Sequence, residues 1–398
     1  MSMNNCPKIA AYYFPNYHAD VQNHIVHGDG WDEWDLVKQA RPRFHDHYQP
    51  RVPLWGYQDE SDPKVMRQKI ECAANYGVDA FIFDWYWHEN GPFLERALLD
   101  GFLPAARDAK LQFSLMWANH DWLDLHPWTC DTPKKLLYHG MLSDAGFEQM
   151  TDFIIDKLFS HPAYLKIDGK PYFSIYEYGK IGGLERLERF REKTIQAGFP
   201  GLHLNLIVQK VAILPGENGT VDLDEIQNSG LFDSLTSYIW LHQVEANRFP
   251  MDSYDRIMRE YFNDYAKIEK RCSLPFYPNV TVGWDSSPRT DQSTAFEASG
   301  YPYSACLNST PELFGQALQR AGKFRSQLIT INAWNEWTEG SYLEPDEKFR
   351  YGYLEQIRKF KDLTDTDRPF VTQPFSNFDE GHIKSTKHKQ QICNCPNR

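Results

Sequence analysis

The sequence predicts an α/β protein whose architecture is a (β/α)8 TIM barrel with long βα loops at the carboxyl-terminal face. Three observations predict this fold. Eight strand-like segments alternate with helical patterns, and most of these segments are nearly continuous in apolar and aromatic residues. Such strands are typical of a parallel sheet that helices cover on its outer face. The length of 398 residues suits one barrel of about 250 residues enlarged by insertions.

The eight predicted strands are spaced so that a helix fits between each pair of neighbours. Apolar runs of this length, rich in β-branched and aromatic residues, are typical of buried strands. Eight such units suggest a closed barrel. The predicted strands cover 8–14, 78–87, 112–119, 170–177, 202–208, 234–240, 275–284 and the first half of 329–345.

The predicted helices differ in the strength of their signals. Asp62 and Pro63 supply an N-cap and a first-turn proline to a helix that ends at Gly77. The weakest unit is the fifth, because its helix at about 222–228 is short. The others cover about 92–109, 143–160, 183–197, 252–270 and 311–325, followed by a last helix with Phe349, Tyr353, Ile357 and Phe360 on one face.

Residues 1–370 are expected to form a single catalytic domain. The segment 15–60 follows the first strand and is rich in Trp, His, Pro and Gly. Long irregular segments inside a compact domain are usually functional, so we expect this first loop to lie over the active site. Periodicity is lost from about residue 370, and residues 371–398 are expected to form a mobile tail.

The charge balance and the apolar pattern argue against several classes of partner. The chain carries 42 basic and 54 acidic residues, a net charge of −12, which argues against nucleic acid and anionic membranes. No apolar run approaches the roughly 20 residues that a membrane span needs. The first residues lack a signal-peptide pattern, so a cytoplasmic protein is the default expectation.

We expect neither a cofactor nor a metal. The seven cysteines are scattered, odd in number and without a C-x-x-C pair, which indicates free thiols. His45-Asp-His47 has no third ligand at helical or hairpin spacing, so structural or sugar-facing histidines are the better interpretation. Asp222-Leu-Asp224 has the D-x-D pattern of metal-dependent glycosyltransferases, but it precedes a helix and is interpreted as a cap. No Walker or G-x-G-x-x-G loop supports nucleotide binding.

Aromatic and polar residues gather at the predicted strand ends, where barrel enzymes have their active sites. All twelve tryptophans lie at or after a strand end, and carboxylates and amides share these positions. Sugar C–H faces pack on flat rings, and sugar hydroxyls need many hydrogen-bonding partners. The mixture therefore favours a carbohydrate ligand.

The stretch 329–345 has the most distinctive chemistry, because a strand runs directly into Glu336 and Glu339 beside Trp334 and Trp337. Carboxylates are costly to keep beside aromatic surface unless they are paired or used. One of the pair could instead cap the turn or accept backbone hydrogen bonds. Paired carboxylates are what glycosidic cleavage requires, one to protonate the leaving oxygen and one to support the developing charge.

Several segments between residue 8 and about residue 360 resemble the WbsX-like proteins, a group similar to glycoside hydrolase family 99 and sometimes labelled glycosyltransferases. The most specific is Ala333-Trp-Asn-Glu-Trp-Thr-Glu-Gly340. The others are Tyr12-Tyr-Phe-Pro-Asn-Tyr-His18, Trp31-Asp-Glu-Trp34, His47-Tyr-Gln-Pro50, Tyr76-Gly-Val-Asp-Ala-Phe81, Tyr86-Trp87, Trp117-Ala-Asn119 and Leu343-Glu-Pro345.

The resemblance implies a (β/α)8 barrel and a retaining glycoside hydrolase of the endo-α-mannosidase type. Its substrate would be an α-linked glycan, such as an α-mannoside or a bacterial-type surface polysaccharide. It implies that Glu336 takes the proton from the sugar 2-hydroxyl, whose oxygen attacks the anomeric carbon and gives an epoxide-like intermediate. Glu339 would protonate the departing oxygen and then activate water. The group usually reads Trp-Ala-Asn-Glu after the third strand, whereas His120 replaces that acid here, beside Asp121. We expect a changed sugar preference.

The candidate substrate contacts come from the strand ends and the matching segments. We expect Trp85, Trp87, Trp117 and Trp334 to line the substrate cleft. An oligosaccharide or polysaccharide would be the partner, and two other interpretations stay open: a glycosyltransferase in polysaccharide biosynthesis, and a carbohydrate-binding barrel without catalysis. The remaining candidates are Tyr13, His18, Trp34, His47, Asp84, Asn119, His120, Glu177, Trp240, Trp284, Asn335 and Trp337.

Overall fold

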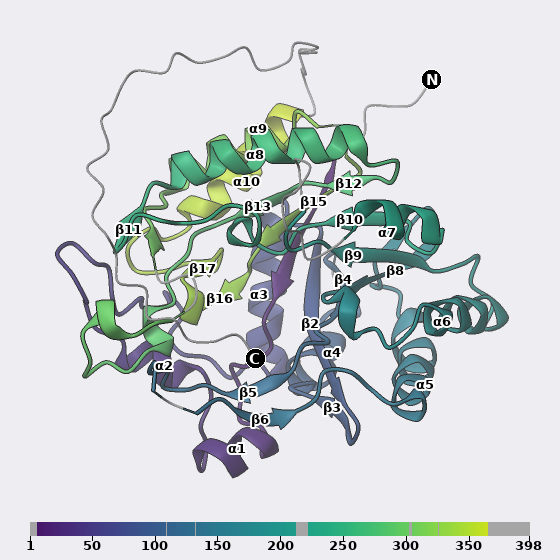
Figure 1. Ribbon diagram of the computed structural model, residues 1–398, viewed down its shortest axis with the longest axis horizontal. Helices are drawn as coiled ribbons and strands as arrows, with labels where there is room; N and C mark the ends of the chain where they lie inside the picture. Colours follow the sequence, from purple (N-terminus) through teal and green to yellow (C-terminus); the bar gives the residue numbers. More distant parts are fainter. Residues whose placement is uncertain are drawn as a thin grey trace.

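Eight parallel positions form the barrel of the computed structural model, which describes residues 6–108, 110–131, 133–211, 222–301, 305–324 and 326–364 (Figure 1). Neighbouring strands pair in chain order, and the last pairs with the first, so the predicted (β/α)8 fold is confirmed. The barrel strands are β1 Lys8–Tyr13, β2 Ala80–His88, β4 Gln112–Trp117, β8 Lys170–Ile175, β9 His203–Ile207, β10 Ser234–Thr236, β12 Phe276–Tyr277 with β13 Asn279–Thr281, and β15 Leu328–Asn332.

The barrel closes at a strand that the sequence predicts as one piece over 275–284. Pro278 divides it into β12 and β13, because proline has no N–H to donate to a neighbouring strand. The first piece pairs with β10 and the second with β15, both in parallel. The two short strands together therefore occupy one barrel position and join the two ends of the sheet.

Helices surround the barrel and cover the outer faces of its strands (Figure 1). Asp62 caps α3 and Pro63 lies in its first turn, as expected. Asp222 caps the short α7 through its side chain, so the D-x-D segment is a helix cap. The helices are α3 Pro63–Asn75, α4 Leu103–Ala105, α5 Asp144–Phe153, α6 Glu185–Gln196, α7 Leu223–Ser229, α8 Tyr254–Arg271, α9 Pro311–Ala321 and α10 Gly352–Thr364.

The second and third helical units differ in detail from the prediction. A π-helical turn over Ala97–Phe102 precedes α4, and a second one over Ile154–Phe159 extends α5. The predicted helix over 92–109 begins later than expected, because Gly91–Phe93 forms β3, which pairs antiparallel with the end of β2. These changes leave the order of the barrel units unaltered.

Long connections follow several strands at their carboxyl ends. The first loop carries α1 Val21–His27 and α2 Trp34–Gln39. β5 Trp122–Asp124 and β6 Lys135–Tyr138 form a hairpin after β4. The shorter strands are β7 Lys166–Ile167, β11 Met251–Asp252, β14 Cys306–Leu307, β16 Asn335–Glu336 and β17 Ser341–Tyr342.

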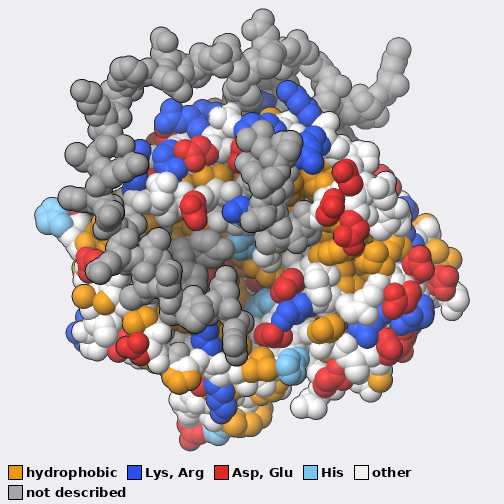
Figure 2. Space-filling view, viewed as in Figure 1, with side chains coloured by type: hydrophobic (Ala, Val, Ile, Leu, Met, Phe, Trp, Pro, Cys, Tyr) orange, Lys and Arg blue, Asp and Glu red, His pale blue; other side chains and the backbone are white. Residues whose placement is uncertain are grey.

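The predicted tail over 371–398 lies outside the described residues. Within the described part of the chain, we find no helix with the length and apolar character needed to cross a membrane. Figure 2 shows acidic and basic side chains interspersed over the visible face of the molecule.

Candidate active site

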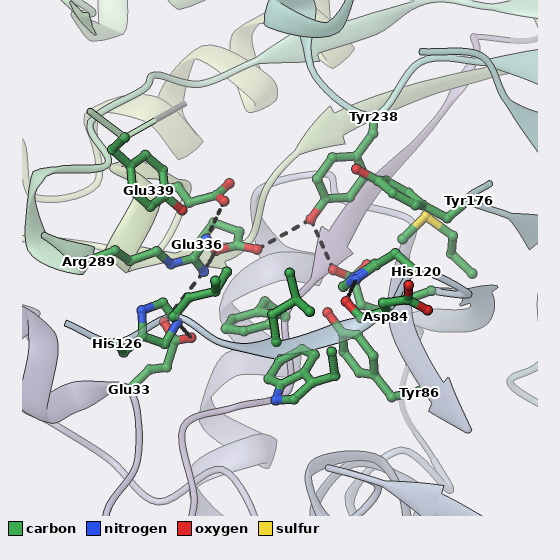
Figure 3. Close-up of a pocket in the computed structure, with 18 residues that line it drawn as sticks. Glu33, Asp84, Tyr86, His120, His126, Tyr176, Tyr238, Arg289, Glu336 and Glu339 are labelled. Carbon is green, nitrogen blue, oxygen red and sulfur yellow. Dashed lines mark hydrogen bonds and ion pairs between the residues drawn. The ribbon is translucent and has the colours of Figure 1, made fainter. Parts of the chain in front are cut away.

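A cavity of about 300 Å³ lies among the carboxyl ends of the strands and the loops that follow them (Figure 3). Its wall combines carboxylates with aromatic rings, as the strand-end pattern predicts. The residues that line it are Phe14, Glu33, Asp84, Tyr86, Met116, Ala118, His120, Asp121, Trp122, Leu123, Leu125, His126, Tyr176, Tyr238, Arg289, Tyr301, Glu336 and Glu339.

A tight turn brings Glu336 and Glu339 to the same cavity. The chain leaves β15, forms the short strand β16 with Glu336, and makes a 3-10 turn over Trp337–Glu339 before β17 pairs back on β16. Gly340 ends the turn with a φ of 61°, a left-handed conformation that glycine adopts without strain. A Cβ at this position would lie 2.7 Å from the Cβ of Asp285, so both backbone conformation and space require glycine.

Arg289 gathers three carboxylates on one guanidinium (Figure 3). Its Nη1 contacts Glu339 Oε1, and its Nη2 lies 3.4 Å from Glu336 Oε2 and 3.5 Å from Glu33 Oε2. The arginine follows β13 in a 3-10 turn over Ser287–Arg289 and is almost fully buried. A buried guanidinium with several carboxylates is a strong constraint on their positions, because its planar fork fixes the geometry of each contact.

Tyr238 joins the glutamate pair to the opposite wall of the cavity. Its hydroxyl lies 3.0 Å from Asp84 Oδ2 and 3.3 Å from Glu336 Oε1. A phenol has a single proton, so it can donate to only one of these carboxyl groups. If the phenol donates to one of the two carboxyl groups, the second contact is a hydrogen bond only when the other carboxyl group is protonated and donates to the phenol oxygen. The geometry therefore favours a stored proton on Asp84 or Glu336.

The protonation of these carboxyl groups follows from burial and from their mutual repulsion. Burial raises the pKa of Glu336 well above its usual value, and the charge of Glu339 adds to the rise while Arg289 opposes it. Burial also raises the pKa of Glu339, and Arg289 again opposes the rise. The pKa of Asp84 is raised well above its usual value by burial. All three groups thus hold their protons more tightly than free carboxyl groups do.

Glu33 behaves differently from these three acids. Burial acts to raise the pKa of Glu33, but the charge of Arg289 and hydrogen bonds from Thr338 and Asn16 oppose it, and the pKa lies below its usual value. Burial lowers the pKa of His126 to about 4. Glu33 therefore favours its anionic form beside Arg289, whereas burial favours the protonated forms of Glu336 and Glu339.

The predicted tryptophan platform is incorrect for Trp85, Trp87 and Trp117, which are buried outside the cavity. Alternate side chains along a strand point to opposite faces. Asp84 and Tyr86 line the cavity, so Trp85 and Trp87 between and after them turn outward and pack on Phe153 of α5. Trp117 likewise packs on Phe147 of the same helix. These rings fill the layer between barrel and helices.

The other candidate tryptophans also lie in the protein interior. Trp334 and Trp337 donate their indole N–H groups to the two oxygens of Glu344, at 2.9 and 2.7 Å. Neither lines the cavity, and the same holds for Trp34, Trp240 and Trp284, which are buried among loop and helix residues. Of the twelve tryptophans, the cavity wall contains Trp122.

The remaining candidates divide between the cavity and the framework around it. Asp84, His120, Glu336 and Glu339 line the cavity. The others support its rim or lie behind it. The side chain of Asn119 forms hydrogen bonds with both the backbone N–H and the carbonyl oxygen of Glu177. The side chain of Asn335 forms the same two hydrogen bonds with the backbone of Phe14. Tyr13, His18 and His47 are buried away from the cavity wall.

The family resemblance leads us to expect an acid at position 120, and the structure places His120 in the cavity wall. Its Nδ1 lies 3.0 Å from the carbonyl oxygen of Asp121, and burial lowers the pKa of the imidazole. Asp121 lines the same wall and pairs with Lys180 at 2.5 Å. This wall therefore presents an imidazole whose neutral form is favoured, next to a carboxylate that is paired with a lysine.

Sequence reasoning did not select several residues that complete the site. Glu33 lies in the motif Trp31-Asp-Glu-Trp34, in which Trp34 gives the stronger signal for a carbohydrate contact. Tyr86 and Tyr238 lie in or directly after strands whose alternation faces them inward. Arg289 could not be predicted as a site residue, because no motif in the sequence around it indicates that it contacts the carboxylates. The lining residues that were not selected include Glu33, Tyr86, Trp122, His126, Tyr176, Tyr238, Arg289 and Tyr301.

The fold and the site together define a (β/α)8 barrel with an acidic, aromatic cavity at the carboxyl ends of its strands. The chain belongs to the family described as glycosyltransferase WbsX, whose model matches residues 9–357. The resemblance drawn from the sequence motifs is thereby confirmed.

The chain is also similar to individual proteins. The uncharacterized protein WxcX of Xanthomonas campestris is 28% identical over 361 residues, which cover 88% of this chain. This chain spans about half, 49%, of that protein. A mouse glycoprotein endo-alpha-1,2-mannosidase-like protein is 24% identical over 84% of this chain and 68% of its own length.

Two solved structures share the fold over most of their length. A GH99 endo-alpha-mannosidase from Bacteroides thetaiotaomicron superimposes with a TM-score of 0.55 and 15% identity, covering 90% of this chain and 97% of that one. A glycoside hydrolase-like protein gives a TM-score of 0.56 at 15% identity, covering 90% and 95%. At these identities the likeness establishes the common barrel.

Proposed function

We propose that this protein is a glycoside hydrolase that cleaves an α-linked glycan with retention of configuration, through Glu336 and Glu339. The observation that carries the proposal is the pair itself. Two buried carboxyl groups with raised pKa values share Arg289 in an aromatic cavity at the carboxyl ends of the barrel strands. Glycosidic cleavage needs one acid that gives a proton and one base that takes one.

Glu339 suits the role of acid and later base. It is the more open member of the pair, since its side chain is 14% exposed and that of Glu336 is 4% exposed. Burial raises its pKa and so favours the protonated form that an acid needs, and the neighbouring Arg289 stabilises the anion that remains after proton transfer. In the proposed mechanism Glu339 protonates the departing glycosidic oxygen, and its carboxylate then removes a proton from the attacking water.

Glu336 suits the role of the base that acts on the sugar itself. In the first step it accepts the proton of the 2-hydroxyl, and that oxygen forms a bond to the anomeric carbon as the glycosidic bond breaks. Water then attacks the anomeric carbon, the bond to the 2-oxygen breaks, and Glu336 returns the proton to that oxygen. Two inversions at one carbon give net retention. The hydrogen-bonded Tyr238 and the cation Arg289 support the two ionisation states of Glu336.

A glycosyltransferase is the second candidate, because the family description uses that name. Such an enzyme would hold a nucleoside diphosphate sugar. The cavity wall presents five carboxyl groups, from Glu33, Asp84, Asp121, Glu336 and Glu339, against the single guanidinium of Arg289. Glu33 favours its anionic form and offsets the charge of Arg289, so the wall offers a diphosphate little net positive charge unless a divalent cation came with it. Charge thus favours the hydrolase.

A ligand screen by thermal shift separates these candidates, because only a ligand that binds the folded chain stabilises it. Nucleotide sugars with Mg²⁺ or Mn²⁺ are compared with simple α-glycosides and α-linked oligosaccharides. We expect stabilisation by the glycosides. Stabilisation by nucleotide sugars alone would favour the transferase, and glycoside binding without any turnover would favour a carbohydrate-binding barrel.

The hydrolase is tested with Glu336→Gln and Glu339→Gln on a panel of α-glycosides, α-mannosides included. Each nearly isosteric change should keep the fold and lower activity by about 10²–10⁴-fold. Activated aryl glycosides should partly rescue Glu339→Gln, because a good leaving group needs little protonation, and should not rescue Glu336→Gln.

Glu148→Gln, which alters a carboxylate bonded to Lys193 outside the cavity, is the matched control. Proton NMR of fresh product should show retained α configuration, and net inversion would contradict the scheme.

A further inference from the structure

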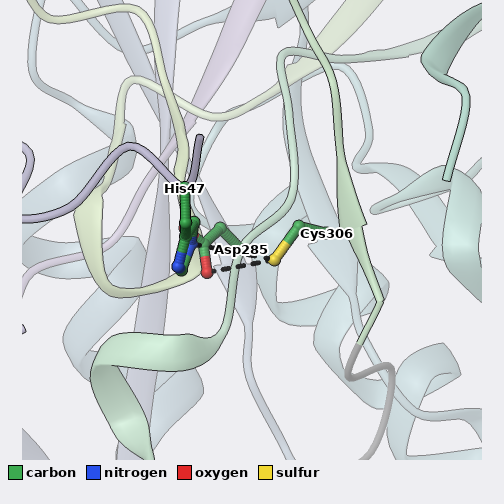
Figure 4. Close-up of side chains that lie close together, drawn as sticks. All are labelled: His47, Asp285 and Cys306. Atoms are coloured by element: carbon green, nitrogen blue, oxygen red, sulfur yellow. Dashed lines mark hydrogen bonds and ion pairs between the residues drawn. The ribbon is translucent and has the colours of Figure 1, made fainter. Parts of the chain in front are cut away.

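A buried polar cluster lies directly behind the glutamate pair and contributes no residue to the cavity wall. His47, Asp285 and Cys306 meet there, from the first loop, the segment after β13, and β14 (Figure 4). His47 Nε2 lies 2.8 Å from Asp285 Oδ2, and Cys306 Sγ lies 3.4 Å from Asp285 Oδ1. All three residues are buried, and Asp285 is fully so.

The hydrogen bonds of His47 show that this cluster is not arranged as a metal site. The backbone N–H of Arg43 donates to His47 Nδ1 at 3.0 Å. The ring proton therefore sits on Nε2 and is donated to Asp285. A histidine that binds a metal through Nε2 carries its proton on Nδ1 instead, where it would face the N–H of Arg43. Arg51 also places a cation 3.3 Å from Asp285 Oδ2. The cluster is thus a hydrogen-bonded network centred on Asp285.

Asp285 holds the turn that carries Glu339. Its backbone N–H donates to the carbonyl oxygen of Glu339 at 2.6 Å. Arg51, which bonds the Asp285 carboxylate, also donates to the carbonyl oxygen of Gly340 at 3.0 Å. Gln49 donates to the same carboxylate oxygen at 2.7 Å. The Asp285 side chain thus connects the first loop, through Gln49 and Arg51, to the turn that carries Glu339.

Asp285 also holds the turn that carries Arg289. Its Oδ1 accepts the backbone N–H of Ser287 at 3.0 Å. Ser287 is the first residue of the 3-10 turn that ends at Arg289. Asp285 therefore bonds both turns whose side chains form the Arg289–Glu339 contact. Its backbone N–H bonds the turn of Glu339, and its carboxylate bonds the turn of Arg289.

We propose that Asp285 is a positioning residue that holds Arg289 against Glu339. The contact between Arg289 and Glu339 does not depend on what the cavity binds. Its role in catalysis rests on the proposed function. Asp285 acts through the backbone of the two turns and through Arg51. It touches neither the cavity nor a reacting atom in the proposed mechanism.

The charge on Glu339 depends on every group that faces it. Arg289 lowers the pKa of Glu339, while burial and the charge of Glu33 raise it. Glu336, Asp84, Tyr238 and Tyr301 face the same carboxyl from the other walls. Because Arg289 is the group that opposes the rise, loosening its contact should raise the pKa of Glu339 further.

The test is the titration of Glu339 in protein labelled with ¹³C at the glutamate carboxyl carbon. The Glu339 signal is identified by its loss in Glu339→Gln, and its midpoint is compared in wild type and Asp285→Asn. Asparagine cannot accept the bonds from His47, Gln49 and Arg51, so the side chain loses the contacts that keep its Oδ1 on Ser287 and Arg51 on Gly340. We expect the midpoint to move upward by about one pH unit.

Asp252→Asn is the matched control. Asp252 is equally buried, accepts backbone N–H groups of its own turn and pairs with Arg256, but lies outside the cavity wall. Its replacement should leave the Glu339 midpoint unchanged. An unchanged midpoint in Asp285→Asn, or equal shifts in both variants, would overturn the proposal.

Arg51→Gln extends the test if Asp285→Asn does not fold. It removes the bond to Gly340 and leaves His47 and Gln49 on Asp285, so a smaller upward shift is expected. No shift in this folded variant would count against the network. The NMR midpoint requires no substrate, so it is measurable even if no glycoside is cleaved. For an active enzyme, the alkaline limb of kcat/KM should move upward with the midpoint, which general loss of stability would not cause.

Discussion

At the scale of single residues, a buried carboxyl group in the cavity can lower the free energy of unfolding, and Asp84 is the example. It lies on β2 with 3% of its surface exposed, and only the hydroxyl of Tyr238 bonds it among the described residues. Its Oδ1 is buried with no hydrogen-bonding partner there. An unsatisfied buried acceptor opposes folding, so this carboxyl group does not contribute to stability, and we propose that it binds a ligand hydroxyl.

We predict that Asp84→Asn stabilises the protein and lowers its activity. Burial raises the pKa of Asp84, so ionisation of this group opposes folding increasingly as the pH rises above the unfolded-state value of about 4. The variant should be more stable by about 1 kcal/mol at pH 7, with a melting temperature roughly 2–4 °C higher. The gain should vanish as the pH falls toward about 4.

Thermal melts over this pH range measure the effect, and Asp346→Asn is the comparison. Asp346 is also buried and also accepts a tyrosine hydroxyl, at 2.8 Å, but it lies outside the cavity wall. It should show no comparable gain. A destabilised Asp84→Asn at neutral pH would mean that this carboxylate is structural.

At the level of elements, the alternation of β2 and β4 decides which aromatic rings face the cavity. Inward positions carry Asp84, Tyr86 and Met116, and outward positions carry the tryptophans that α5 covers. Strand ends alone do not distinguish these faces. The direction of each side chain follows from the register of the strand in the barrel.

We predict that Trp117→Ala destabilises the fold and leaves binding by folded molecules unchanged. Trp117 is fully buried against Phe147, and replacing a buried Trp by Ala usually costs about 3–5 kcal/mol. Trp122 is the matched control, because it lines the cavity and is only partly buried. Trp122→Ala should weaken sugar binding with a smaller loss of stability. Denaturant unfolding and calorimetric binding measure the two effects, and the reverse pattern would restore the platform interpretation for Trp117.

A second element-level feature is the buried ion cluster of Lys69, Glu60 and Glu344. Lys69 on α3 lies 2.6 Å from Glu60 in the first loop and 2.5 Å from Glu344 after β17. Asn335, next to Glu336, donates to Glu60 at 2.9 Å. The cluster therefore joins a helix and the first loop to the strand end that carries the glutamate pair.

We predict that Lys69→Met costs about 3–5 kcal/mol at pH 8, because it leaves two buried carboxyl groups without their cation. Burial raises the pKa of Glu60 to about 7, with Lys69 opposing the rise, so loss of Lys69 raises it further. Below that value the acid is neutral, and the cost at pH 5 should be smaller than at pH 8. Denaturant unfolding at both pH values measures this. Equal losses would show that packing, not charge, dominates, and Glu60→Gln combined with Lys69→Met should recover part of the loss.

At the scale of the whole molecule, the net charge of −12 favours neutral or cationic partners over anionic ones. Figure 2 shows charges of both signs on the visible face, and the net charge adds a long-range field around the molecule. Such fields are screened by salt over a Debye length of about 30 Å at 0.01 M and about 8 Å at 0.15 M.

We therefore predict that raising the salt concentration over this range strengthens the binding of an anionic α-linked glycan and leaves a neutral one of equal length unaffected. Screening removes repulsion only where the ligand is charged. Calorimetric titration of the two glycans at both ionic strengths measures the difference. The same salt dependence for both would show that net charge has no part in selecting the glycan.

The sequence by itself determined the barrel and the glutamate pair. Both depend on local patterns, since apolar strands alternating with helices predict a parallel barrel and a strand that runs into Glu336 and Glu339 places two acids at one end. Only the tertiary structure decided the rest of the site. Glu33 and Arg289 are 256 residues apart, and no local pattern records that they meet. The tryptophans were misplaced for the same reason, because the face of a strand that becomes the cavity is chosen by the closure of the barrel and the packing of its helices.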